Sequence, residues 1–153
     1  MLRRARMIAD FQFGRGSGWA LFPEGTTYKL SNTKRLRYLY SADERIATVR
    51  AKDGLLTLSM LGARRLYDHL SAPRLRVTAS QEAAPYVARG GTLFSRHVTE
   101  VDPEIRAGEE VLVVDEGGGL IATGKAHLSP EEMIQMNRGP AVKIRKGADE
   151  SDE

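Results

Sequence analysis

The sequence predicts an α+β protein in two small halves: an antiparallel sheet with a helix, followed by a half built mainly of strands. Ala63, Leu66, Tyr67 and Leu70 have the spacing of an amphipathic helix. From residue 92 onward, short apolar runs alternate with polar and glycine-containing turns, which is typical of strands. Pro73 bars continuation of the helix and the charge balance changes there, so we place the boundary between residues 73 and 74.

The first half contains three further segments with a structural signal. In residues 8–22, apolar and aromatic residues are interrupted by three glycines, and we predict two short strands around a glycine-rich bend. Residues 36–41 and 45–51 predict a hairpin closed over the sequence SADE, and residues 55–59 predict the next strand. Ser59 is the expected N-cap of the amphipathic helix.

The second half opens with a short helix in residues 80–91, whose end is marked by the pair Gly90 and Gly91. Ser129, Pro130 and Glu132 form the signature of a capping box at the start of a later helix. Strands are expected in four segments, namely residues 92–101, 110–116, 120–129 and 140–146. The tail, residues 148–153, has one alanine as its only apolar residue, and we expect it to be disordered.

The composition is that of a globular protein. The chain has 153 residues, of which 41% are hydrophobic and 28% are charged. It has no cysteine, which excludes disulfides, a thiol nucleophile and thiolate-bound zinc, and its apolar runs are too short to cross a bilayer. The expected location is therefore the cytoplasm.

The charges are distributed unevenly along the chain. The net charge is +3, but residues 1–73 carry 13 Lys/Arg against 6 Asp/Glu, residues 74–147 carry 10 of each, and residues 148–153 carry 4 acids without a base. Of the 23 cations, 17 are arginine. Because arginine binds phosphate through two donors and stacks on bases, this distribution points toward a nucleic-acid partner, with a merely solvated basic surface as the open alternative.

The sequence contains partial matches to cofactor-binding motifs, but none of them fits its motif completely. Residues 119–126 fit a phosphate-binding loop except for the final hydroxyl, but they have the character of a strand. The GRGSG sequence at 14–18 lacks the third glycine of a dinucleotide fingerprint, so we interpret it as a bend in a sheet. The three histidines have no partners at ligand spacing. We therefore expect no catalytic residue, no metal and no cofactor.

The remaining candidate is an RNA-binding site formed by the glycine pair and the last strand. Glycines after a short helix leave backbone amides bare of side chains, where a sugar-phosphate chain can approach. Nearby cations supply charge and an aromatic ring supplies a stacking surface. The residues concerned are Arg89, Arg96, Lys143, Arg145, Lys146 and Phe94. A plain helix stop at the glycines and a core position for Phe94 remain open alternatives.

Residues 74–146 resemble a PUA domain, a small RNA-binding pseudobarrel. The matching features are VARGGTLFSRHV, the phrase formed by Ile105, Gly108 and Val111, the LIATG strand and the closing GPAVKIRK. ADFQFGRGSGWALFP and RIATVRAKDGLLTLSMLGARRL are similar to the domain that precedes PUA in archaeal archaeosine tRNA-guanine transglycosylases. That family's catalytic barrel and zinc-binding cysteines are missing from these residues.

The resemblance implies binding of tRNA on its acceptor-stem side. It carries over to the residues Arg89, Gly90, Gly91, Thr92, Phe94, Arg96, Lys143 and Arg145. It further implies a non-catalytic protein that assists a separately encoded tRNA-guanine transglycosylase catalytic chain. The alternatives are a ribosome-biogenesis or rRNA-binding factor with a C-terminal PUA domain, and an RNA-modifying enzyme that uses Asp10, Asp43 or Asp53.

Overall fold

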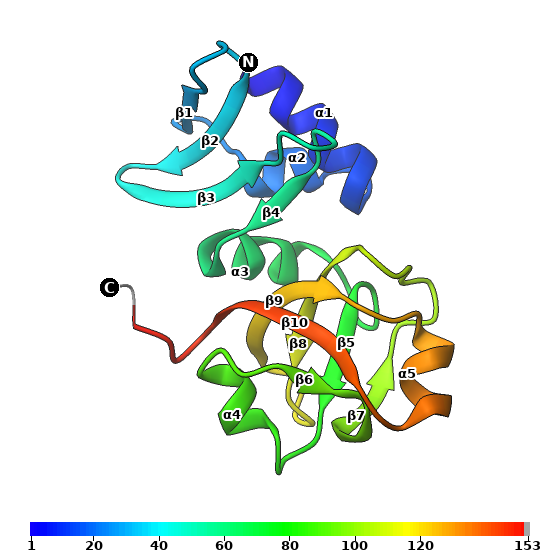
Figure 1. Ribbon diagram of the computed structural model, residues 1–153. Coiled ribbons are helices and arrows are strands. Elements are labelled where there is room, and N and C mark those ends of the chain that lie inside the picture. Colours follow the sequence, from blue (N-terminus) through cyan, green and yellow to red (C-terminus); the bar gives the residue numbers. More distant parts are fainter. Residues whose placement is uncertain (152–153) are drawn as a thin grey trace. The chain divides into compact units, whose positions relative to one another are not determined.

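The computed structural model describes residues 1–151 and has two compact units, which divide between His69 and Leu70 (Figure 1). The first unit combines a four-stranded antiparallel sheet with three helices, and the second is a nearly closed β pseudobarrel with two short helices. The predicted α+β class and pseudobarrel are therefore confirmed.

Residues 8–22 are helical, so the prediction of two strands there was wrong. They belong to α1 (Leu2–Phe13) and α2 (Ser17–Leu21). Ala5, Ala9 and Phe13 recur at intervals of four and are buried on one face of α1, which is the spacing of a helix. The sequence prediction missed this spacing because glycines and aromatic residues are typical of strands and bends. The GRGSG sequence is thus the corner between two helices and not a bend in a sheet.

Two glycines make this corner possible. Gly16 has a φ of 86°, a conformation that favours glycine. Gly18 lies so close to α1 that an added Cβ would stand 2.4 Å from the carbonyl oxygen of Arg6. The Gly18 N–H donates to the Asp10 carboxylate at 2.7 Å, which ties α2 to α1.

The sheet of the first unit follows the chain order β1-β2-β3-β4. Its strands are β1 (Thr27–Leu30), β2 (Leu36–Ser41), β3 (Glu44–Val49) and β4 (Leu56–Leu58). The predicted hairpin of β2 and β3 and the strand after it are confirmed. Helix α3 (Met60–His69) begins after Ser59, whose Oγ accepts from the Gly62 N–H at 3.1 Å, as the capping prediction required.

The second unit has a six-stranded sheet in the order β6-β10-β9-β8-β5-β7. Its strands are β5 (Arg76–Ala79), β6 (Leu93–Phe94), β7 (Val98–Val101), β8 (Glu110–Val114), β9 (Leu120–Ala126) and β10 (Pro140–Gly147). Only β5 and β8 pair in parallel. Its helices are α4 (Ala84–Ala88) and α5 (Pro130–Met136), and Val77, Leu93, Val111 and Val142 belong to its core.

Two details of this unit differ from the sequence prediction. Strand β5 was missed, although Val77 and Ala79 alternate with more exposed neighbours. The single strand expected over residues 92–101 is divided by a 3₁₀ turn, η1 (Ser95–His97), into β6 and β7, which pair with different strands. The turn thus connects the two edge strands of the six-stranded sheet.

The predicted capping box of α5 is present in full. Ser129 Oγ accepts from the Glu132 N–H at 3.3 Å, and the Glu132 carboxylate accepts from the Ser129 N–H at 2.9 Å. The Ser129 N–H, and with it the Ser129 hydroxyl, stabilises the ionised carboxylate and holds the pKa of Glu132 below its ordinary value. The N-terminus of α5 is therefore fixed by hydrogen bonds between residues three positions apart.

The start of the acidic tail is hydrogen-bonded, which departs from the disorder expected for residues 148–153. The N–H groups of Ala148 and Asp149 donate to the carbonyls of Ile121 and Ala88, each at 2.8 Å. Glu150 accepts from the Gly147 N–H through its carboxylate, also at 2.8 Å. Residues 152 and 153 lie outside the described part of the chain. Within residues 1–151, no helix is long and apolar enough to span a membrane.

Candidate nucleic-acid interface

The structure brings together the two segments that the sequence singled out, because the loop from Arg89 to Phe94 runs antiparallel along β10. At one end, Leu93 pairs with Val142 and Phe94 pairs with Pro140. At the other end, Gly147 packs so closely on the helix terminus that an added Cβ would stand 2.8 Å from the Gly90 nitrogen. We call this margin of the second unit, residues 89–96 with β10, the PUA edge.

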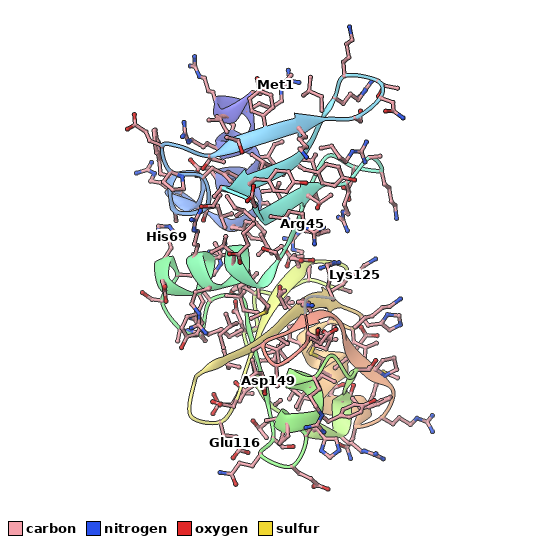
Figure 2. All side chains as sticks on the ribbon, turned by 90° about the vertical axis from the view of Figure 1, so that its left-hand side faces the viewer. Met1, Arg45, His69, Glu116, Lys125 and Asp149 are labelled. Atoms are coloured by element: carbon pink, nitrogen blue, oxygen red, sulfur yellow. The ribbon has the colours of Figure 1, made fainter. Side chains whose placement is uncertain are left out.

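The cations of β10 lie on the outer side of the strand. Lys143 and Arg145 are exposed, whereas Val142 is buried and Ile144 is half-buried, as the alternating faces of a strand require. In the sheet register, Lys143 stands opposite Lys125 of β9, which is labelled in Figure 2. Directly opposed residues share a face, so Lys125 extends the positive charge of the PUA edge.

Arg145 is already committed to an ion pair. Its guanidinium contacts the carboxylate of Glu110 on β8, and the Glu110 side chain is 3% exposed. A carboxylate buried to this extent requires a cation, since an unpaired buried charge is strongly unfavourable. Arg145 therefore stabilises the fold by pairing with Glu110, a role that could not be predicted from its position in the sequence.

The amides of the glycine pair also have partners. The Gly90 N–H donates to the Val87 carbonyl at 2.9 Å, and the Gly91 N–H donates to the Tyr86 carbonyl at 3.0 Å, so both close the end of α4. Gly90 has a φ of 98°, as a helix stop requires. These amides serve the helix stop, which was the alternative interpretation of the glycine pair.

Gly91 lies beneath the ring of Tyr86. An added Cβ at Gly91 would stand 2.2 Å from the Tyr86 ring, yet 53% of the Tyr86 residue surface remains exposed. Sequence reasoning missed this aromatic residue, although its place five residues before Gly91 in YVARGG carried the signal. Tyr86, on α4, thus adds a second accessible ring next to the PUA edge, which itself contains Phe94.

The other predicted residues are accessible to different degrees. Phe94 is 38% exposed, which the core alternative does not explain, and Arg89 is exposed at the end of α4. Thr92 is half-buried. Arg96 is exposed, and its Nε donates to Nε2 of His97 at 3.3 Å, while Nδ1 of His97 lies 3.3 Å from the Ser80 hydroxyl. This chain of contacts orients Arg96 on η1.

The acidic segment lies against the glycine pair. The Glu150 carboxylate stands where a side chain on Gly90 would be, 2.6 Å from the position of its missing Cβ. Asp149, labelled in Figure 2, is held on the Ala88 carbonyl through its backbone. Negative charge is therefore placed at the same loop that was predicted to face RNA.

The three aspartates considered for catalysis have no catalytic arrangement. Asp10 accepts from the Gly18 N–H, and Asp53 accepts from Arg50 and from the Leu55 N–H. Asp43 is exposed in the turn of the β2–β3 hairpin. Among residues 1–151, no three His, Asp or Glu side chains cluster in a way that would hold a metal ion.

Comparisons with known proteins agree with this architecture. Residues 3–73 match the "Patch-forming domain C2 of tRNA-guanine transglycosylase", and residues 75–148 match the PUA domain. The chain is 45% identical to the tRNA-guanine(15) transglycosylase of Methanothermobacter thermautotrophicus over 147 residues, which are 95% of this chain and 22% of that protein. The chain thus spans less than a quarter of the length of this relative.

Two solved structures share the fold over nearly the whole chain. A hypothetical protein from Pyrococcus horikoshii OT3 has a TM-score of 0.73 and 22% identity, with 97% of this chain and 90% of that chain covered. A conserved PUA domain protein from Thermoplasma acidophilum has a TM-score of 0.64 and 21% identity, with 97% and 91% covered. At these identities the likeness describes the fold alone.

The pseudobarrel, the glycine-ended helix α4 and the basic strand β10 define a PUA domain, which here follows a small α+β domain. The chain thus consists of a tRNA-guanine transglycosylase C2 domain followed by a PUA domain, and it corresponds to the C-terminal region of the archaeal enzymes.

Proposed function

We propose that this chain is a non-catalytic tRNA-binding subunit that serves archaeosine-type tRNA modification beside a separately encoded tRNA-guanine transglycosylase catalytic chain. The observation that supports the proposal is the match of nearly the whole chain, 95% of it at 45% identity, to a tRNA-guanine(15) transglycosylase, together with its PUA domain. The chemistry of base exchange would belong to the catalytic chain, and this chain would supply RNA affinity and position.

The PUA edge is the proposed contact with the acceptor arm of tRNA. Lys143 and Lys125 share one outer face of the sheet, and Arg96 is held outward on η1. Arginine and lysine at such an edge bind phosphates and fix the position of the RNA without reading its sequence. Phe94 and Tyr86 add accessible rings on which an unpaired base can stack.

The two remaining parts of the PUA edge would contribute indirectly. Arg145 offers its charge from within the pair with Glu110, and Gly147 lets the end of α4 lie close to β10. Binding is therefore expected to depend on charge and shape, and to weaken as salt rises.

Copurification with a tRNA-guanine transglycosylase catalytic chain, followed by a guanine-exchange assay on an unmodified tRNA transcript, tests the proposal. We expect the two chains to associate and exchange to be faster with both than with the catalytic chain alone. The proposal fails if they neither associate nor cooperate. Sedimentation of this chain with pre-ribosomal particles, and not with tRNA, would support the ribosomal alternative instead.

A further inference from the structure

Five basic side chains line a hollow in the first unit. The hollow has a volume of about 390 Å³ and is lined by α1, the start of β2, the end of β3 and the β3–β4 turn. Its basic lining residues come from three separate parts of the chain and are Arg4, Arg35, Arg37, Arg50 and Lys52. We call this feature the arginine hollow.

A single carboxylate, Asp53, belongs to the lining of the arginine hollow. Arg50 donates to both of its oxygens, from Nε at 3.1 Å and from Nη2 at 2.5 Å. The Leu55 N–H donates to Asp53 as well, and this bond, with the Arg50 contact, holds the pKa of Asp53 below its ordinary value. Asp53 thus stays ionised and fixes the orientation of Arg50.

The other cations of the hollow have no such partner. Across the described residues, no carboxylate lies at ion-pair distance from Arg4, Arg35, Arg37 or Lys52. Like charges that share one hollow repel each other, so the arrangement is unfavourable by itself. A folded protein that keeps such a cluster gains free energy when a multivalent anion binds there.

Arg37 provides an independent indication of a ligand. Its Nε is buried and has no hydrogen-bond partner within residues 1–151. A buried donor without an acceptor is costly, and few such groups occur in folded proteins. Because Arg37 lines the hollow, an anion bound beside its guanidinium would supply the missing acceptor.

The lining favours an RNA backbone over an acidic protein. Four of the five basic residues are arginines, and guanidinium groups match the phosphate oxygens of a diester geometrically. An adjoining hollow of about 760 Å³ shares Arg4 with the first and is bordered by Phe11, which is 84% exposed. An exposed ring beside a cluster of cations is the arrangement that binds nucleic-acid strands by stacking and charge.

We propose that the arginine hollow is a second phosphate-binding site, which holds the sugar-phosphate backbone of the same tRNA that the PUA edge contacts. This inference rests on the proposed tRNA-binding function. It gives the first unit a direct part in RNA binding through residues for which the motif analysis found no site.

The test compares Arg35→Gln/Arg37→Gln with the control Arg45→Gln in titrations of an unmodified tRNA transcript at several salt concentrations. Arg45 is exposed on β3 outside the hollow and is labelled in Figure 2, so its variant loses a charge without altering the site. We expect the double variant to bind about tenfold more weakly near physiological salt, with a salt slope shallower by about two. The control is expected to change affinity by less than about twofold.

The single variant Arg35→Gln controls for loss of binding that is caused by misfolding. It is expected to fold normally because it removes one of several like charges at an exposed residue. Its thermal midpoint should match that of wild type while its salt slope falls by about one. The inference is overturned if the variants bind tRNA as the control does, or if they lose only the association with the catalytic chain. Absence of tRNA binding by the wild-type chain would instead refute the proposed function.

Discussion

The two units hold their cations in different ways. In the arginine hollow, Arg50 is paired with Asp53, while Arg35 and Arg37 have no carboxylate at ion-pair distance in the described chain. At the PUA edge, Arg145 is bound to a buried glutamate, the glycine amides close a helix, and an acidic segment covers Gly90. A basic residue is therefore available to RNA only where the fold does not already use its charge. Arg35 and Arg37 are available in this sense, whereas Arg145 is paired.

The largest expected effect separates Arg145 from its neighbour Lys143. Arg145→Ala leaves the buried Glu110 without this guanidinium, so the free energy of unfolding should fall by about 3 kcal/mol. Lys143→Ala removes an exposed cation of the same strand and should change stability by less than about 0.5 kcal/mol while weakening tRNA binding. Denaturant titration of both variants measures their free energies of unfolding. Equal values would refute the claim that Arg145 stabilises the fold through Glu110.

An intermediate effect is expected at Arg96. Arg96→Ala should weaken tRNA binding several-fold and make the salt slope shallower by about one, because one phosphate contact is lost. A matched control is Arg106→Ala, which removes an exposed arginine outside the PUA edge. Fluorescence anisotropy across a salt series provides the measurement. Identical slopes for the two variants would remove Arg96 from the interface.

A smaller effect, of opposite sign, is expected at the acidic segment. Glu150→Gln removes a negative charge that lies beside Gly90, so tRNA should bind about twofold to threefold more tightly at low salt. The Gly147 N–H keeps an acceptor in the amide oxygen, which limits the structural change. Glu116→Gln, in the β8–β9 turn, is the control of equal charge. Tighter binding by both variants alike would mean that net charge alone is responsible.

The smallest effect concerns Asp53 and acid. Its pKa is lowered in the folded state, so its contribution to stability is present above the unfolded pKa of about 3.9 and is lost as the pH falls through the lower folded value. Asp53→Asn should therefore cost about 0.5 kcal/mol at neutral pH, as expected for an exposed pair, and nothing at strongly acidic pH. A difference between wild type and variant that persists in strong acid would contradict this origin.

Local chemistry made much of the fold predictable from sequence. The hairpin of β2 and β3, the Ser59 cap of α3 and the capping box at Ser129 each depend on residues a few positions apart, and each was found. Helices α1 and α2 were missed because the glycines and aromatic residues of 11–22 resemble a strand boundary. Their helical period lies in small alanines, whose burial depends on packing against the rest of the unit.

The candidate site was predictable in its segments but not in its chemistry. The resemblance to PUA domains brought residues 89–96 and β10 to one edge, and the structure pairs them. The ion pair of Arg145 with Glu110 joins residues 35 positions apart, so no local sequence pattern predicts it. The same is true of the arginine hollow, whose cations converge from α1, the start of β2 with the residue before it, and the β3–β4 turn.

Titration of the wild-type chain with an unmodified tRNA transcript across about 50 to 200 mM salt tests the central claim most directly. We predict that log affinity falls linearly with log salt with a slope of at least about four, since both the PUA edge and the arginine hollow contribute phosphate contacts. An unstructured RNA of equal length should bind more weakly. Affinity that is independent of salt, or equal for the two RNAs, would contradict the account.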